Sequence, residues 1–182
     1  KLSNYDFESD VSVNILGHIF EQSLTDLEEI QSSILNNTFD KTKTKRKKDG
    51  AFYTPEYITK YIIDNTLKKI CVDKKTELNL LFIDVPKNKS KLLKSEKETL
   101  KNIYLYREFL LNLKIIDIAV GSGAFLNQAL EFLISEHSSL DEMRKIYENE
   151  ELSLYDIESN ILENNLYGVD INEDAVEIAK LS

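Results

Sequence analysis

Two glycines and two aspartates are the residues of this sequence whose types and spacing could bind a nucleotide-like ligand. The tripeptide Gly121-Ser122-Gly123 directly follows a short β-branched run and precedes a helical pattern. Glycines in such a turn let the backbone approach a ligand at a helix N-terminus, where free N–H groups attract negative charge. Asp117 and Asp170 each stand at the end of a predicted strand. The pattern therefore predicts ligand binding at the ends of two neighbouring strands.

The spacing argues against a dinucleotide cofactor. In the fingerprint of dinucleotide-binding domains a third glycine follows the first two, and an acidic residue lies about twenty residues further on. Here Leu126 takes the position of the third glycine, and Asp170 lies forty-seven residues after Gly123. A strand, a glycine turn and a helix are weak evidence by themselves. The ligand therefore has to be inferred from the two aspartates.

The two aspartates suit a ligand that carries a ribose and an ammonium group. A carboxylate accepts several hydrogen bonds, so Asp170 could accept from both ribose hydroxyls of an adenosine. Asp117 offers a second acceptor for an ammonium group. S-adenosylmethionine has an amine, a carboxylate and a ribose but no pyrophosphate, which fits both aspartates and the missing third glycine. In the alternative interpretation both aspartates are strand-end caps that face solvent, and spacing alone leaves both interpretations open.

The elements around these residues predict the opening of a parallel α/β sheet. A strand over 114–119 is followed by the glycine turn and by a helix over 124–134. A second helical region, in two pieces, covers 141–165. A second strand over 166–170 then leads into a helix over 172–181. Strands and helices that alternate in this order are typical of α/β folds.

The first part of the chain is predicted to be helical and to end in a basic arm. Apolar residues at helical spacing begin after Asp10 and continue to Ile34. Residues 41–48 then hold six lysines and arginines and no acidic residue. We therefore divide the chain into a helical region with a basic arm, 1–49, and an α/β region, 50–182.

Between the basic arm and the first strand, two further helices are predicted. Thr54 at the N-cap and Pro55 at the first helical position mark the start of one, whose apolar face runs to Ile70. Residues 72–96 mix a short apolar run with lysine-rich sequence and predict no regular element. The last helix before the strand is predicted over 100–109.

The composition is that of an ordinary globular protein inside the cell. The 182 residues are 42% hydrophobic and 30% charged, which argues against wholesale disorder. No apolar run approaches the roughly 20 residues that a membrane span needs. The first residues contain no signal-peptide core, and Cys71 has no second cysteine with which to form a disulfide. We therefore expect a cytoplasmic protein, with Cys71 as a small buried residue.

The net charge of -9 is confined to one region. Residues 141–182 hold twelve acidic and three basic residues, whereas residues 1–140 hold twenty of each. The basic arm lies within the balanced part. Net charge therefore does not exclude a nucleic-acid partner.

Three short motifs occur in an order that resembles the adenine-N6 DNA methyltransferases. Residues 50–55, 117–126 and 167–172 read GAFYTP, DIAVGSGAFL and YGVDIN. They are similar to motifs X, I and II of the class that places motif X first. Residues 16–23, ahead of the basic arm, are similar to the large restriction–modification enzymes of type IIG. The resemblance covers 14–182 loosely and implies the opening strands of a Rossmann-like, S-adenosylmethionine-dependent methyltransferase sheet.

The resemblance implies a role at the cofactor for individual residues. Phe52 and Thr54 match positions that close over the methionine end. Asp117 and Ala119 match residues that contact the amino-acid part of the cofactor. The two glycines match the close backbone approach, and Asp170 matches the acid that binds the ribose. The candidate cofactor-binding residues are Phe52, Tyr53, Thr54, Pro55, Asp117, Ala119, Gly121, Gly123, Phe125, Asp170 and Ile171.

Four of these candidates have a second interpretation. Ile171 matches the side chain that packs on the adenine face. Phe52, Tyr53, Phe125 and Ile171 are all apolar or aromatic, and each could instead be an ordinary core residue.

The resemblance also indicates what is absent. Related enzymes carry an Asn/Asp-Pro-Pro-Tyr/Phe motif that binds a flipped adenine, whereas this chain has only Pro55 and Pro86. We therefore expect an inactive part of a larger enzyme that transfers methyl to adenine N6 in double-stranded DNA. Alternatives are a methyltransferase acting on RNA or protein, and a non-enzymatic module that binds DNA or a partner.

The expected position of the first strand predicts an open sheet edge. In the family's fold this strand is central, so residues 115–119 should present unpaired backbone groups where later strands belong. The helix after the turn should lose part of its cover at Phe125, Leu126, Leu130 and Leu133. We expect the chain to self-associate, or to cover this edge with residues 72–96.

Overall fold

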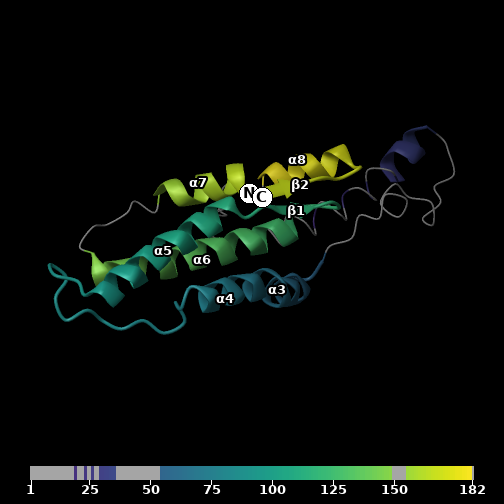
Figure 1. The fold of residues 1–182 in the computed structure, drawn as a ribbon. Coiled ribbons are helices and arrows are strands. Elements are labelled where there is room, and N and C mark those ends of the chain that lie inside the picture. Colours follow the sequence, from purple (N-terminus) through teal and green to yellow (C-terminus); the bar gives the residue numbers. More distant parts are fainter. Residues whose placement is uncertain are drawn as a thin grey trace, which may run out of the picture. The chain divides into compact units, whose positions relative to one another are not determined.

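The computed structural model describes residues 54–148 and 155–181, together with Ile19, Ser23, Asp26 and residues 29–35. The basic arm at 41–48, Phe52 and Tyr53 lie outside the described residues. The chain forms two compact units. The first unit comprises 1–59, 116–127 and 168–182, and the second unit comprises 60–115 and 128–167. Figure 1 traces the elements along the chain.

The second unit is helical. It contains α4 (Leu67–Glu77), α5 (Lys94–Asn112), α7 (Tyr155–Asn164) and most of α6 (Ala124–Tyr147). Helix α5 packs against α7. Helices α4, α5 and α6 meet at Glu136, whose Oε2 accepts a hydrogen bond from Tyr106 Oη and pairs with Lys75 Nζ, both at 2.6 Å. The ring of Tyr106 is fully buried, so this polar contact lies at the edge of the apolar core.

The expectation for Cys71 is confirmed. Its side chain is 1% exposed in α4, and burial raises the pKa of the thiol to about 11. Cys71 is therefore a neutral thiol at physiological pH and packs as a small core residue.

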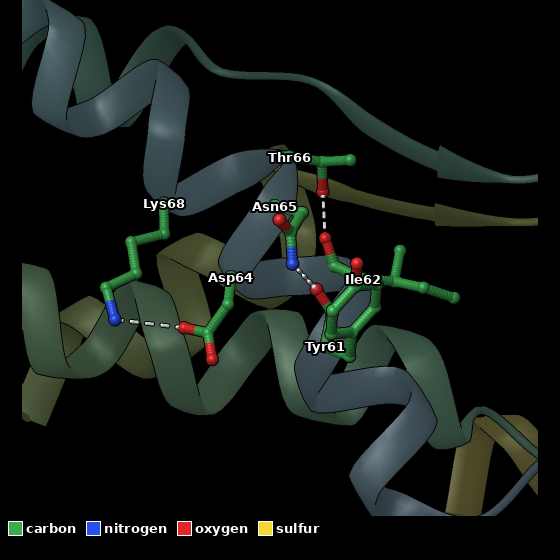
Figure 2. Close-up of polar contacts among 6 residues, drawn as sticks. All are labelled: Tyr61, Ile62, Asp64, Asn65, Thr66 and Lys68. Carbon is green, nitrogen blue, oxygen red and sulfur yellow. Dashed lines mark hydrogen bonds and ion pairs between the residues drawn. The ribbon is translucent and has the colours of Figure 1, made fainter.

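Helix α3 (Glu56–Asn65) begins directly after Pro55, as predicted, and α4 follows it after a single residue. Side chains satisfy the carbonyls at the end of α3 (Figure 2). Thr66 Oγ1 donates to Ile62 O at 2.6 Å, and Asn65 Nδ2 donates to Tyr61 O at 2.7 Å. Because the last carbonyls of a helix have no partner within the helix, such bonds stabilise a break between two helices. The sequence prediction of one continuous helix to Ile70 is therefore wrong.

The predicted apolar face of these helices is only partly buried. Ile63 and Leu67 are in the core, whereas Ile62 and Ile70 are exposed. The sequence pattern places both exposed residues on the apolar face of a single straight helix. The buried positions Thr59, Ile63, Leu67 and Cys71 recur every four residues on both sides of Thr66, so the predicted face is only partly correct.

Two strands form a small parallel sheet. Strand β1 (Ile115–Asp117) and strand β2 (Leu166–Gly168) are neighbours. Ile115 N–H donates to Asn165 O, and Val169 N–H donates to Asp117 O, both at 2.8 Å. These bonds advance in the same direction along both strands, which is the parallel arrangement. The described part of the chain is therefore an α/β structure that is mostly helical, as the order of predicted elements indicated.

Among the described residues two helices, α6 and α7, lie between the strands, where the sequence predicted three helical pieces. Helix α6 continues to Tyr147 rather than ending near 134, and α7 is the second piece. Helix α8 (Glu173–Leu181) follows β2 as predicted. Of the helix residues expected to lose cover, Leu133 is fully buried, so that expectation is wrong for Leu133. Among the described residues no helix is both long and apolar enough to cross a membrane.

Asn165 fixes the junction of helix and strand in the second unit. Its fully buried side-chain amide donates to Leu110 O at 2.8 Å and to Leu113 O at 2.7 Å. These carbonyls belong to the last turn of α5 and its C-cap, immediately before β1. The backbone oxygen of Asn165 in turn accepts from the first residue of β1. One residue thus ends α5 and starts the pairing of the two strands.

We expect Asn165→Ala to lower the free energy of unfolding by about 1–3 kcal/mol, since Leu113 O loses the amide donor and Leu110 O keeps only the bond from Leu113 N–H. Urea unfolding monitored by far-UV circular dichroism measures this. Asn164→Ala is the matched control, because Asn164 is exposed and its side chain bonds to a carbonyl of its own helix. Equal losses in the two variants would contradict the role of Asn165.

The connection between α4 and α5, residues 78–93, has no regular secondary structure but is held to the helices of the second unit. Asn102 Nδ2 donates to Leu78 O at 3.0 Å, and Tyr147 Oη donates to Asp84 O at 2.6 Å. Ile116 and Ile118 of the first unit are 62% and 78% exposed. Cover of the sheet edge at 115–119 by residues 72–96 stays a prediction. Self-association stays a prediction.

His137 is buried in the second unit and gives it a pH dependence. Its Nε2 has no hydrogen-bond partner among the described residues. Burial lowers the pKa of His137 below its ordinary value of 6.5, aided by the charge of Arg107 and opposed by Asp141 and Glu136. The unfolded chain therefore binds more protons than the folded chain just below pH 6.5. The contribution of His137 to stability is complete above that pH and is lost as pH falls toward the folded-state pKa.

We expect the free energy of unfolding to fall below pH 6.5 with a slope from this residue of at most about 1.4 kcal/mol per pH unit. Urea unfolding at a series of pH values measures it. The control is His137→Leu, which removes this proton while leaving every carboxylate and the other histidine in place. The same pH dependence in both proteins would rule out His137 as the source.

Candidate cofactor site

The glycine turn is built at the end of β1 as the sequence predicted. Gly121 and Gly123 both have left-handed backbone conformations, with φ of +52° and +88°. Gly123 N–H donates to Val120 O at 2.9 Å and closes the turn, and Gly123 O accepts from Asn127 in the first turn of α6. Most side chains avoid positive φ, so these two glycines are required by the backbone itself.

Backbone pairing brings the end of β2 to this turn. Beyond the strands proper, Val120 N–H donates to Val169 O at 2.9 Å. This bond places Asp170 next to Gly121, although 49 positions separate the two residues in the sequence. Gly121 N–H then donates to Asp170 Oδ2 at 2.8 Å. All of these residues belong to the first unit.

Asp170 uses both carboxylate oxygens in the turn. Besides the bond from Gly121, its Oδ1 accepts from Asn172 N–H at 2.9 Å. A carboxylate has about four acceptor positions, so roughly two remain on this half-buried group. Asp170 therefore acts as a cap for its own loop and for the glycine turn, and still has acceptor positions for two hydroxyl groups. The two interpretations of Asp170 that the spacing left open, a ligand-binding carboxylate and a strand-end cap, are therefore compatible with each other.

Asp117 is oriented by the backbone that follows it. Its Oδ1 accepts from Ala119 N–H at 3.0 Å, which is the geometry of an Asx turn at the end of β1. The side chain is half-buried, and Ala119 is exposed. The remaining oxygen of Asp117 is available to a cation. No group of three or more metal-binding side chains occurs in the part of the chain that the structure describes.

The three glycines of the site differ in what surrounds them. A Cβ on Gly121 would meet no atom of the described residues within 4 Å, so this glycine faces open space in that part of the chain. A Cβ on Gly168 would lie 2.8 Å from Val120 Cγ2, which is too close for any real contact. A Cβ on Gly123 would lie 3.4 Å from Ala179 Cα. Gly168 and Gly123 therefore allow tight packing, while Gly121 leaves room for a ligand.

The apolar candidates are exposed to different extents. Ile171 is 82% exposed beside Asp170, so the alternative interpretation of Ile171 as a core residue is wrong. Phe125 is half-buried in the first turn of α6. An isoleucine in solvent next to a carboxylate offers an apolar surface to the flat ring of an adenosine whose ribose binds that carboxylate.

The candidates before α3 are only partly described. Thr54 is exposed and Pro55 is half-buried, and Pro55 O accepts hydrogen bonds from Ile58 and Thr59 in the first turn of the helix. These bonds explain the helix start that the sequence predicted. A cofactor role for Thr54 and Pro55 stays a prediction.

Asn172 holds the acidic loop to α8, a role that was not among the sequence predictions. Its Oδ1 accepts from Asp174 N–H at 3.0 Å and from Ala175 N–H at 3.3 Å, so it is the N-cap of α8. The side chain is 3% exposed. An asparagine ahead of two acidic residues at a helix start is a recognisable N-cap signal. Through its own N–H, Asn172 also fixes the carboxylate of Asp170.

Comparison with known proteins gives one informative match. The chain is similar to a Methanocaldococcus jannaschii protein named "Putative type II restriction enzyme and methyltransferase", with 35% identity over 182 residues. The alignment covers 96% of this chain and 14% of that protein, so the chain spans about one seventh of its relative's length. No family model matches the chain. No solved structure matches it either.

Proposed function

We propose that the turn at Gly121 and the carboxylate of Asp170 form part of an S-adenosylmethionine site in a DNA methyltransferase of a restriction–modification system. The observation that supports this most is the juxtaposition of Asp170 Oδ2 with Gly121 N–H, at 2.8 Å, beside a glycine that faces open space. A ribose acceptor and a backbone without side chains then lie next to each other, as an adenosine cofactor requires.

The residues present fit the cofactor in four respects. The open space at Gly121 admits a ligand close to the backbone. Asp170 retains acceptor positions for the ribose hydroxyls, and Ile171 offers an apolar surface for the adenine. Asp117 offers an acceptor for the ammonium group. When bound, S-adenosylmethionine supplies a methyl group on a sulfonium, which is already a good methyl donor.

The contribution of this chain would be to position the cofactor. The turn and Asp170 are tied together by backbone hydrogen bonds, so the acceptor positions are fixed before a ligand arrives. Fixed positions reduce the ordering cost of binding, and orientation of the donor accounts for much of the rate in group transfer. Phe52, Tyr53, Thr54 and Pro55 would complete the methionine end of the site.

The substrate we propose is double-stranded DNA, methylated at adenine N6. The name of the relative supports a restriction–modification role, and the order of the motifs around 50–55, 117–126 and 167–172 supports the adenine-N6 class with motif X first. The same order supports a Rossmann-like domain, and the resemblance of residues 16–23 to type IIG enzymes is the basis for proposing that type.

Equilibrium dialysis with radiolabelled S-adenosylmethionine tests the cofactor assignment. We expect saturable binding that S-adenosylhomocysteine displaces, because it keeps the ribose, adenine and amino-acid groups. NAD should not displace it, since the turn lacks the third glycine and the acid is placed differently. Displacement by NAD and not by S-adenosylhomocysteine, or no saturable binding of S-adenosylmethionine, would refute the assignment.

A further inference from the structure

The connection between α4 and α5 presents large apolar side chains to solvent. Phe82 is 94% exposed, Val85 is 73% exposed and Leu81 is 47% exposed. Figure 1 shows this segment as the extended teal trace that leaves α4 and reaches the start of α5. A phenylalanine that is almost wholly in solvent gains nothing from folding, so its position suggests a contact with another molecule.

The backbone around Phe82 is fixed. Leu80 is 1% exposed and its N–H donates to Lys75 O at 2.8 Å. Pro86 is buried, and Asp84 O accepts from Tyr147 Oη at 2.6 Å. The segment is therefore anchored on both sides of Phe82, and the ring is held outward rather than carried on a free tail.

The residues that follow form a basic surface. Residues 85–94 contain four lysines and no acidic residue, and all four lysines are exposed: Lys87, Lys89, Lys91 and Lys94. Lys97 and Lys101 lie on the same face of α5 as Lys94, at helical spacing, and both are exposed. Within 78–101 there are six lysines and three carboxylates, which belong to Asp84, Glu96 and Glu98. In a chain with a net charge of -9, this is a local concentration of positive charge.

We propose that residues 81–94 are a DNA-contacting surface, in which the lysines bind backbone phosphates and Phe82 contacts bases. This inference rests on the DNA substrate proposed above and assigns a place where the chain would hold that substrate. Lysines placed along a segment match the regular charge of a phosphate backbone. An exposed aromatic ring beside them can stack on unpaired bases or wedge between base steps.

Charge distinguishes this partner from an apolar protein surface, which would not require four exposed lysines beside the ring. An anionic membrane would attract the same residues, but membrane-surface segments usually present their apolar side chains on one face of an amphipathic helix. Residues 78–93 are not helical. The test therefore includes vesicles as a separate arm.

Binding of the 182-residue chain to a fluorescent DNA duplex, over a series of salt concentrations, tests the proposal. Replacing Lys87 and Lys91 together by glutamine should lower the slope of log affinity against log salt by about 1.8, because each phosphate contact on duplex DNA contributes about 0.9. The matched control replaces Lys60 and Lys69, which are exposed on α3 and α4, and should leave the slope unchanged.

Phe82→Ala separates base contact from charge. We expect affinity for DNA with an unpaired base to fall about five- to 150-fold, the range for one stacked base, with no change in the salt slope. Because the ring is exposed, folding should be unaffected. The proposal would be overturned if Phe82→Ala bound DNA with an unpaired base as tightly as the unmodified chain. It would also be overturned if the variant at Lys87 and Lys91 had the same salt slope as the control variant. The proposal would be overturned as well if the unmodified 182-residue chain did not bind DNA.

Two further measurements keep this inference distinct from the cofactor proposal. Binding of S-adenosylmethionine should be the same in all of these variants, so loss of cofactor binding throughout would refute only the cofactor site. Cosedimentation with phosphatidylserine vesicles should be no greater for the unmodified 182-residue chain than for Phe82→Ala. Vesicle binding that depends on Phe82, without DNA binding, would assign the surface to membranes and refute the DNA proposal.

Discussion

Replacing Asp170 by alanine is expected to weaken the binding of S-adenosylmethionine by roughly 10- to 150-fold. The carboxylate is the proposed acceptor for the ribose, and hydrogen bonds to a charged group contribute about 1.5–3 kcal/mol. The same change removes the acceptor of Gly121 N–H and Asn172 N–H, so the turn itself should also be less well fixed. Isothermal titration calorimetry of both proteins measures the change in affinity.

Asn172→Ala is the matched control for this loosening of the turn. It removes the N-cap of α8 and should cost about 1 kcal/mol of stability, while the Asp170 carboxylate stays in place. If the ribose assignment is correct, Asn172→Ala should bind the cofactor far better than Asp170→Ala at comparable unfolding temperatures. Equal affinities in the two variants would mean that Asp170 acts only as a structural cap.

Gly121→Asn is expected to reduce cofactor binding on the order of 100-fold, near the upper end of the 1–3 kcal/mol that overpacking costs. The described part of the chain leaves room for the new side chain, because none of its atoms lies within 4 Å of the position that the Cβ would take. That room is where the cofactor should lie. The variant should therefore fold but exclude its ligand, as measured by thermal unfolding and calorimetry on the same sample.

Asparagine is chosen because it tolerates the required backbone conformation. Asn79 adopts a φ of 54°, nearly the same as the 52° of Gly121. Asparagine populates this region more readily than most side chains, so backbone strain should be small. Asn79→Gly serves as the control, since it changes a residue of similar conformation away from the site and should leave cofactor affinity intact. If Gly121→Asn bound S-adenosylmethionine with unchanged affinity, the open space beside Gly121 would not be where the cofactor binds.

Local signals in the sequence were sufficient for the parts of the site that each lie on one segment. A run of β-branched residues predicted the strand ahead of Gly121, and the two glycines predicted the turn that positive φ confirms. The strand ahead of Asp170 and the helix after it were predicted in the same way. The parallel pairing of β1 and β2 then followed from the order of strand, helix and strand.

Features that depend on contacts between distant segments could not be predicted. Gly168 looked like any strand glycine, and its close approach to Val120 appears only once the strands are paired. Asn165 is polar in sequence, but its burial follows from two carbonyls more than fifty positions earlier. Ile62 is exposed whereas its neighbour Ile63 is buried, a difference that the apolar pattern by itself does not predict. Such properties are set by tertiary packing, which overrides local pattern.

An NMR titration of the 15N-labelled chain with S-adenosylmethionine tests the central claim most directly, because it reports where the ligand binds. We predict amide shift changes at Asp117–Gly123 and Val169–Asn172, with the largest at Gly121, and the same set with S-adenosylhomocysteine. Changes confined to residues of the second unit, or no changes at Gly121 and Asp170 at saturating ligand, would contradict a cofactor site at this turn.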